Sequence, residues 1–263
     1  MVTVLKTIAL AFSLFSAIPV PQSEWNDRNL RYVLCAFPLV GAVTGGVCSL
    51  WLYVCGALQL PALLQGAGLT LLAVMISGGI HLDGLCDTAD ALGSHAERDK
   101  MIAILKDSHC GASALIACCS WFIGMTAFAA GIEPSAQYMA ACALTFTLSR
   151  LLSAFAAVSL APAAESSFLS ALAGAANKRA VRIVCGALAL GLSFAASLYA
   201  PWYGLAAAAA QGAVSVRYVR LCRRFGGASG DLAGWFVQWA EFASFGAIAA
   251  VSAVSAFMTG GIG

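Results

Sequence analysis

The chain has 263 residues, of which 61% are hydrophobic and only 10% are charged, and its mean hydropathy is +0.87. A soluble globular domain carries about a quarter charged residues because its surface must be solvated. This composition therefore excludes a water-soluble fold and predicts an integral membrane protein. The net charge of +2 gives no broad positive field, so we expect no nucleic-acid partner.

The first apolar run covers residues 4–18 and ends at Pro19 and Pro21. It is shorter than the roughly 20 residues that a membrane-spanning helix needs. We expect a re-entrant or interfacial segment, although a full crossing with Lys6 outside stays open.

Seven longer apolar runs follow in chain order. They lie near residues 33–55, 62–82, 110–131, 137–160, 182–199, 202–217 and 232–257. They predict an all-α, polytopic helical bundle with about seven transmembrane helices. We find no repeat or low-complexity linker, so residues 1–263 are interpreted as a single membrane-embedded domain.

Lys and Arg alternate between the predicted connections. Segments 19–31, 83–109, 163–182 and 217–231 contain them, whereas 56–61, 132–136, 200–201 and the C-terminal tail do not. The positive-inside rule then places the basic segments in the cytoplasm and the tail outside. We expect a multi-pass protein of a bacterial or archaeal inner membrane. One missed helix would break this alternation, so it supports the predicted number of spans.

Acidic residues are concentrated in one segment. Six of the twelve Asp and Glu lie within residues 83–107. Asp83, Asp87 and Asp90 are spaced i, i+4, i+7, so on a helix they point within roughly 40° of one direction. Three carboxylates on one stripe repel one another unless a cation lies between them. Oxygen ligands suit Mg²⁺, which completes its shell with water and substrate phosphates. We predict a magnesium site here, with a solvated helix face as the alternative.

Two features adjoin this stripe. His81 is either a catalytic assistant or a packed or capping group at the helix end. Residues 94–107 combine charges with apolar residues at helical spacing, which is typical of an amphipathic helix on the cytoplasmic membrane surface. Lys106 at its end either meets a phosphate or serves as a positive-inside anchor.

A second polar group lies near the C-terminus, where Arg223 and Arg224 precede a glycine-rich turn ending at Asp231. Backbone N–H groups and arginines in such a turn can hold phosphate oxygens. Asp231 is either an N-cap or a neighbour of the metal. Glu241, roughly 15 Å further along the same helix, needs a partner, and Arg150 is the intramembrane cation available. The pair is either structural or the floor of an active site.

At these residues the chain resembles the adenosylcobinamide-GDP ribazoletransferase family, also called cobalamin (5′-phosphate) synthase. The most specific block runs from Gly78-Gly79-Ile-His81 through Leu82-Asp83-Gly84-Leu85-Cys-Asp87-Thr88-Ala89-Asp90. Supporting blocks are Leu14-Phe15-Ser-Ala-Ile18-Pro19-Val20-Pro21, Phe37-Pro38-Leu39-Val40-Gly41, Lys106-Asp107-Ser108, Ser149-Arg150, Gly226-Gly227-Ala-Ser229-Gly230-Asp231 and Glu241.

The resemblance implies a late step of vitamin B12 assembly. The 5′ oxygen of α-ribazole, or of α-ribazole 5′-phosphate, attacks the cobinamide-bearing phosphorus of adenosylcobinamide-GDP, and GMP leaves. Mg²⁺ is the implied cofactor, held on the diphosphate by Asp83 and Asp87. Asp90 completes the metal site or accepts the attacking proton, and His81 assists. The implied substrate-binding and phosphate-binding residues are Lys106, Asp107, Arg150, Arg223, Arg224, Gly226, Gly227, Gly230, Asp231 and Glu241.

Two other functions compete with this interpretation. A CDP-alcohol phosphotransferase making phospholipid also uses membrane aspartates, but its Asp-Gly-x-x-Ala-Arg start differs from Asp83-Gly-Leu-Cys-Asp87. A cation-coupled transporter would place its carboxylates near the midplane and often show inverted repeats. The expected partners are the two substrates and the lipid bilayer. A homo-oligomer, or a complex with other enzymes of the corrinoid pathway, stays open.

Overall fold

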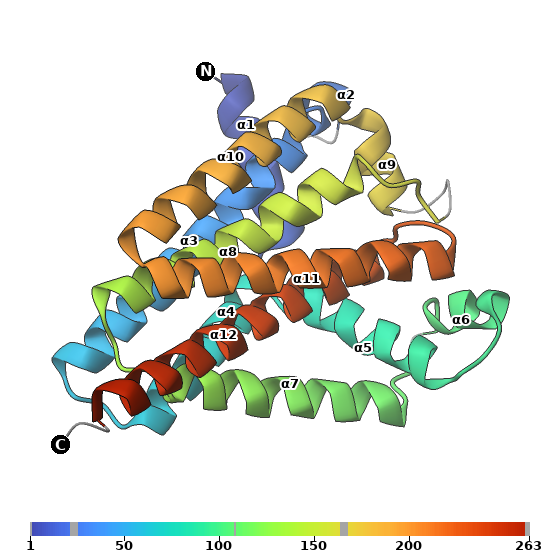
Figure 1. Ribbon diagram of the computed structural model, residues 1–263. Helices are drawn as coiled ribbons and strands as arrows, with labels where there is room; N and C mark the ends of the chain where they lie inside the picture. Colours follow the sequence, from blue (N-terminus) through green and yellow to red (C-terminus); the bar gives the residue numbers. More distant parts are fainter. Residues whose placement is uncertain (1, 22–25, 108, 164–167, 261–263) are drawn as a thin grey trace.

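The computed structural model describes residues 2–21, 26–107, 109–163 and 168–260, which form the helices α1 to α12 (Figure 1). Within these ranges the one β feature is an isolated parallel bridge between Pro162 and Ala228. The predicted all-α fold class is therefore confirmed. Ser108, part of one family motif, lies outside the described residues.

The helices differ widely in length. They are α1 Val2–Phe15, α2 Asp27–Leu30, α3 Val33–Ala57, α4 Ala62–Ser77, α5 Ile80–Gly93, α6 Arg98–Ile104, α7 Ala112–Ala130, α8 Ala136–Ala157, α9 Phe168–Ala175, α10 Lys178–Tyr199, α11 Pro201–Phe225 and α12 Gly230–Gly260. Helix α8 lies at the centre of the bundle, where it contacts α3, α10, α11 and α12. Helices α5 and α7 pack on the other side of α12.

Five or six helices of the described chain meet the length and hydropathy expected of a membrane span, compared with the predicted number of about seven. Among the described residues, α3, α7, α8, α10 and α12 are long and apolar enough to cross a membrane. The pair α4 and α5 makes a sixth candidate if it is counted as one broken span. Helix α11 is long enough, but arginines 217, 220, 223 and 224 crowd its C-terminal part and lower its hydropathy. Large apolar side chains such as Ile123 and Leu190 are exposed, as expected for contact with lipid.

The predicted span near residues 62–82 is broken by a sharp bend. Helix α4 ends at Ser77 and α5 begins at Ile80, and the two axes differ by 95°. Gly78 and Gly79 make the bend with φ values of 64° and 77°, a left-handed conformation that glycine adopts without a Cβ clash. The backbone N–H of Ala17 donates to the carbonyl of Ile76 at 2.8 Å and fixes the corner. The acidic stripe therefore lies on a helix of its own.

The two short predicted segments both form helices. Helix α1 is 14 residues long, and its buried Leu10 and Ala11 pack against Val33 and Ala36. Its re-entrant or interfacial position in the membrane stays a prediction. The amphipathic helix is shorter than predicted, because α6 covers only Arg98–Ile104, and it buries Met101.

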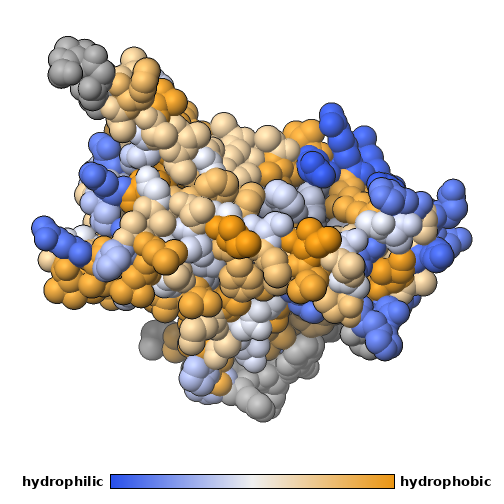
Figure 2. Space-filling view, turned by 90° about the horizontal axis from the view of Figure 1, so that it is seen from below, coloured by the Kyte–Doolittle hydropathy of each residue, from blue (hydrophilic) through white to orange (hydrophobic). Residues whose placement is uncertain are grey.

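The four basic connections meet at one end of the molecule. There the N–H of Asn177 donates to the carbonyl of Arg31 at 2.9 Å, and the N–H of Ala163 donates to Ala228 at 2.9 Å. Figure 1 shows α6, α9 and the α11–α12 turn at this end, on the right. In Figure 2 hydrophilic side chains gather at the same end, and apolar ones cover the middle. The predicted alternation of the connections is confirmed, while their cytoplasmic location stays a prediction.

Candidate active site

Helices α5 and α12 touch backbone to backbone at two glycines. A Cβ on Gly84 would lie 2.5 Å from the carbonyl oxygen of Asp231, and one on Gly234 would lie 3.0 Å from that of His81. Small residues allow such a close approach between helices that have no hydrophobic driving force in lipid. The crossing brings the start of α12 against the acidic stripe of α5.

Asp231 joins the carboxylates of α5 as a result. The negative charges of Asp83, Asp231 and Asp90 all repel that of Asp87, and Asp83 also repels Asp231. The N-cap alternative for Asp231 is not what the structure shows, because the hydroxyl of Ser229 accepts the N–H of Leu232 at 3.2 Å. Asp231 is half-buried and lies in the first turn of α12. The mutual repulsion favours a cation between these groups.

Asp90 has a different environment from the other two aspartates of the stripe. Its carboxylate oxygens accept the backbone N–H groups of Gly111 at 2.5 Å and Ala114 at 2.8 Å, where α7 begins. A carboxylate at a helix N-terminus satisfies free donors and complements the helix dipole. Asp90 therefore ties α7 to α5, and its role as a metal ligand or base stays a prediction.

The carboxylates are not gathered around a single point. In the described part of the chain, no group of three or more His, Cys, Asp or Glu side chains is close enough to hold a metal ion. Magnesium, however, is usually bound through one or two carboxylates together with substrate phosphates and water. Asp83 and Asp87, one helical turn apart and repelling each other, fit that kind of site. The residues do not fit a cage made of protein ligands alone.

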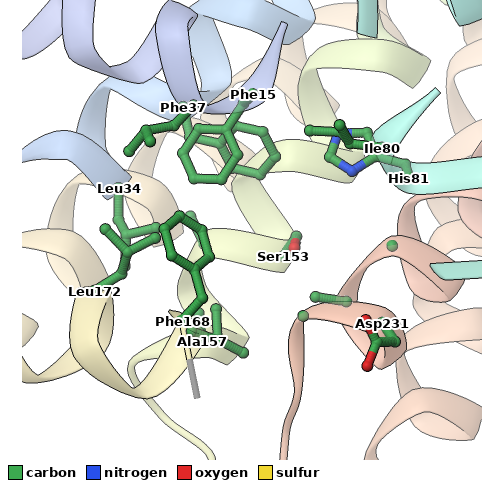
Figure 3. A pocket seen from close by; sticks show the side chains of 16 residues that line it. Phe15, Leu34, Phe37, Ile80, His81, Ser153, Ala157, Phe168, Leu172 and Asp231 are labelled. Atoms are coloured by element: carbon green, nitrogen blue, oxygen red, sulfur yellow. The ribbon is translucent and has the colours of Figure 1, made fainter. Parts of the chain in front are cut away.

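A cavity of about 250 Å³ opens beside Asp231 (Figure 3). Apolar side chains from α1, α3 and α9 form one side, among them Phe15, Phe37 and Phe168. The polar side chains His81, Ser153 and Asp231 lie on the other side. The cavity thus lies between an aromatic wall, formed by Phe15, Phe37 and Phe168, and the carboxylate of Asp231.

His81 is held by packing and faces the cavity. It is 6% exposed, and its ring meets that of Phe37 edge-on with centroids 5.9 Å apart. Its buried Nε2 atom has no hydrogen-bond partner among the described residues. A buried imidazole nitrogen normally finds a partner, so this atom is available to a bound molecule.

The glycine-rich turn contacts two regions. On one side Arg223, Gly226 and Gly227 line a second pocket of about 300 Å³. The guanidinium of Arg98 from α6 lies against Gly226, where it leaves no room for a side chain. On the other side Gly230 lines the cavity beside Asp231. Arg224 is exposed at the end of α11.

Lys106 and Asp107 are exposed in the turn after α6. An oxygen of Asp107 lies 2.6 Å from Nδ1 of His109. This hydrogen bond raises the pKa of His109 above its ordinary value and lowers that of Asp107. The Asp107 carboxylate is therefore paired with a neighbour, and its predicted contact with a substrate stays a prediction.

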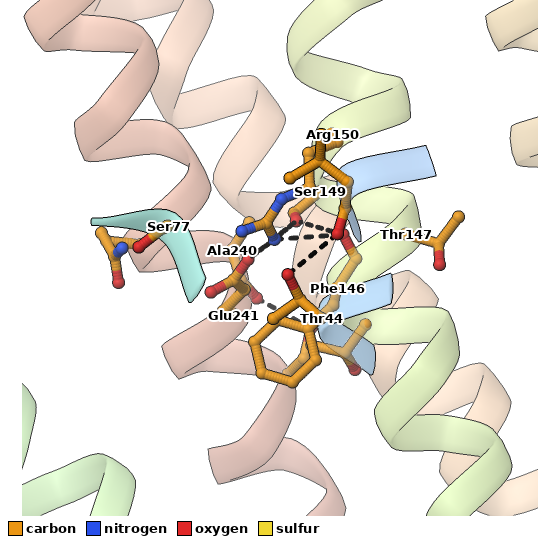
Figure 4. A network of polar contacts seen from close by, with 12 residues as sticks. Thr44, Ser77, Phe146, Thr147, Ser149, Arg150, Ala240 and Glu241 are labelled. Carbon is orange, nitrogen blue, oxygen red and sulfur yellow. Dashed lines mark hydrogen bonds and ion pairs between the residues drawn. The ribbon is translucent and has the colours of Figure 1, made fainter. Parts of the chain in front are cut away.

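The predicted pair of Arg150 and Glu241 forms in the core of the bundle (Figure 4). Arg150 of α8 donates to Glu241 of α12, and the two side chains are 1% and 2% exposed. Ser149 also donates to Glu241 at 3.0 Å, and Arg150 donates to the carbonyl of Phe146 at 3.1 Å. Neither Arg150 nor Glu241 is among the described residues that line the cavity. This geometry favours the structural alternative over an active-site floor.

Comparison with known proteins identifies the family. A family model described as cobalamin-5-phosphate synthase matches residues 7–249. The chain belongs to this family. A protein of Lachnoclostridium phytofermentans named adenosylcobinamide-GDP ribazoletransferase is 35% identical over 234 residues, which are 89% of each chain. The resemblance predicted from the sequence is confirmed.

Shorter matches within the cobalamin-5-phosphate synthase family carry the same name. A protein of Clostridium perfringens is 34% identical over 42% of this chain and 44% of its own length. One of Listeria monocytogenes is 35% identical over 45% of this chain and 48% of its own length. No solved structure matches the chain.

Sequence reasoning missed the aromatic wall and Arg98. Phe15 and Phe37 lie in two blocks that resemble the cobalamin-5-phosphate synthase family, and that resemblance was the available signal. Ser153 stands in an apolar run and Phe168 in the basic connection over residues 163–182, and neither position has a pattern that indicates a cavity. Arg98 follows the stripe closely, but its contact with Gly226 joins segments far apart in the sequence.

We expect Gly84→Ala to lower activity by about 100-fold while the protein still inserts. The added methyl group meets the Asp231 backbone at 2.5 Å, so α5 and α12 must move apart. Displacing catalytic groups by about 1 Å can cost about 10²-fold in rate. Turnover of the purified variant measures this. Gly191→Ala is the matched control, because nothing lies within 4 Å of its added carbon. Equal activity of the two variants would show that the crossing does not position the site.

Proposed function

We propose that the chain transfers the phosphocobinamide group of adenosylcobinamide-GDP to α-ribazole or α-ribazole 5′-phosphate, with release of GMP. The observation that carries this proposal is the 89% coverage by a relative of that name, together with the site that the family's His81–Asp90 block builds on α5. The product is adenosylcobalamin or its 5′-phosphate.

In the proposed reaction, a bond forms between a free ribose hydroxyl oxygen of the ribazole and the phosphorus that carries cobinamide. The 5′ oxygen expected from the sequence resemblance is wrong, because in α-ribazole 5′-phosphate that oxygen already carries the phosphate that the 5′-phosphate product retains. The bond from that phosphorus to the bridging oxygen of the diphosphate breaks, and GMP leaves with the electron pair. A carboxylate accepts the proton of the attacking ribose hydroxyl. Such transfers depend mainly on positioning and charge neutralisation.

Asp83 and Asp87 would hold Mg²⁺ through carboxylate oxygens, with the substrate diphosphate and water completing its shell. The bound ion would neutralise charge on the diphosphate. Their mutual repulsion, and the repulsion of each by Asp231, which lines the cavity, support this assignment. Asp90 supports the site from its position at the N-terminus of α7.

Asp231 is our proposed proton acceptor, because it lines the cavity and lies beside Asp83. A general base must reach the proton that it abstracts. His81 would orient the acceptor with its free Nε2 atom. Arg223, supported by Arg98 and the glycine-rich turn, would bind the phosphate of the leaving GMP. Lys106 and Arg224 add positive charge at the same end of the bundle.

We further propose that this end faces the cytoplasm of a bacterial or archaeal cell. The basic connections gather there, as expected for the cytoplasmic side of an inner membrane. Both proposed substrates are polar and phosphorylated or nucleoside-like, so a site that opens to the cytoplasm suits them.

Purified protein in detergent should form a cobalamin product and GMP from adenosylcobinamide-GDP and α-ribazole. Chelation of divalent cations with EDTA should stop the reaction, and excess Mg²⁺ should restore it. Product formation is measured by chromatography of the corrinoids. Activity on CDP-alcohols without any cobalamin product would show that the chain is a CDP-alcohol phosphotransferase instead. Cation uptake into proteoliposomes without turnover would show that it is a cation-coupled transporter.

A further inference from the structure

The cavity beside Asp231 combines features that define its ligand. Phe15 of α1 and Phe37 of α3 form one wall, with ring centroids 4.2 Å apart and planes inclined by 40° (Figure 3). Phe168 of α9 adds a third ring. Aromatic side chains brought together from three helices form a surface on which a flat aromatic ring can stack.

The polar side chains of the cavity are confined to one side. Ser153 of α8 and Asp231 of α12 lie there, together with the unpartnered Nε2 atom of His81. His81 is more than nine-tenths buried, so this nitrogen points to a polar group of a ligand. A lipid chain would leave it unsatisfied, whereas a nitrogen heterocycle bearing a sugar would not.

The volume narrows the choice between the two substrates. About 250 Å³ is below the roughly 300–1,000 Å³ typical of sites for drug-sized ligands. One fused aromatic ring fits such a space, whereas a corrin macrocycle does not. The cavity therefore suits the acceptor better than the donor.

On the basis of the proposed function, we infer that this cavity binds the flat, apolar base of the acceptor nucleoside. The base stacks against Phe15, Phe37 and Phe168, and its ribose points to Ser153 and Asp231. This orientation places the attacking ribose hydroxyl beside Asp231. The corrinoid then lies outside the cavity, above Asp83 and Asp87.

The test compares kinetic constants for the two substrates. In Phe37→Ala and Phe168→Ala, the KM for α-ribazole should rise about tenfold, as expected for the loss of one stacking ring. The KM for adenosylcobinamide-GDP should stay within about twofold. Phe194→Ala is the matched control, since its ring is 67% exposed on α10, and it should behave as the wild type.

A variant that fills the cavity gives a second test, which does not depend on correct folding of the two alanine variants. Ala157 lines the cavity and is 6% exposed, so Ala157→Phe should occupy the space. Calorimetric titration of this variant with α-ribazole, without the second substrate, should show binding weakened by about tenfold or more. Thermal unfolding of every variant verifies that it is folded.

Two outcomes would overturn this inference while leaving the proposed function intact. In the first, the KM and the affinity for α-ribazole are unchanged in Phe37→Ala, Phe168→Ala and Ala157→Phe, and a lipid that copurifies with the wild type is absent from Ala157→Phe. The other is a KM increase for adenosylcobinamide-GDP in place of α-ribazole. Failure of the proposed function is recognised separately, because the wild-type protein would then release no GMP when α-ribazole is added.

Discussion

Asp83→Asn and Asp87→Asn should each lower turnover by about 10²–10³-fold or more, in a protein that still inserts and folds. An amide has nearly the shape of a carboxylate but carries no charge to hold a cation on the diphosphate. Electrostatic groups at a reacting centre are typically worth about 10²–10³-fold each. Because these carboxylates repel one another, removing one charge should leave the stability of the fold unchanged or slightly raise it.

Turnover and thermal unfolding of the two variants measure this expectation together. Asp99→Asn is the matched control, since Asp99 is exposed on the neighbouring helix α6 and carries the same charge. It should keep the wild-type rate. Near-normal turnover in Asp83→Asn or Asp87→Asn would show that these carboxylates do not hold the metal ion.

Glu241→Ala and Arg150→Ala should each destabilise the fold by about 3–5 kcal/mol. Either change leaves its partner as an uncompensated charge in the core of the bundle, since both side chains are at most 2% exposed. Replacing both residues by apolar ones, as in the double variant Arg150→Met with Glu241→Leu, removes the charges together. Such replacements of a buried ion pair are often neutral or stabilising.

Unfolding midpoints of the two single variants and the double variant complete a mutant cycle. We expect the double variant to be much more stable than either single variant and to retain turnover. Single variants that unfold like the wild type but lack activity would contradict the structural role. They would show that the pair acts on the substrate.

Much of the topology followed from the distribution of charge. Lys and Arg fall in every second connection, and the structure gathers those connections at one end. The spacing of Asp83, Asp87 and Asp90 predicted a helix, and α5 contains all three. Hydropathy predicted the long helices well because a lipid environment leaves little choice of backbone structure.

The corner at Gly78 and Gly79 was missed for a physical reason. Residues 62–82 form one apolar run, and hydropathy does not record direction. Two consecutive glycines in the left-handed region turn the chain by 95°, so the acidic stripe lies on α5 and not on a continuation of α4. The sequence showed the glycines but not the torsion angles that they adopt, nor the hydrogen bond from Ala17 to Ile76 that holds the corner.

The contacts that build the site were also beyond sequence reasoning. Asp90 accepts the N–H of Gly111, 21 residues later, at the start of α7, and Asp231 reaches α5 from near the other end of the chain. The cavity collects Phe15, Phe37 and Phe168 from three separate helices. Residue spacing predicts neighbours within one helix, whereas the packing of different helices determines these groupings.

The most direct test is to measure GMP release and α-ribazole affinity on the same Asp83→Asn sample. If the carboxylates act on the diphosphate and the cavity holds the acceptor, this variant releases no GMP but binds α-ribazole with wild-type affinity. Wild-type protein should release one GMP for each cobalamin formed, and only when Mg²⁺ and both substrates are present. An Asp83→Asn variant that turns over, or one that loses α-ribazole binding together with activity, would contradict this division of the site.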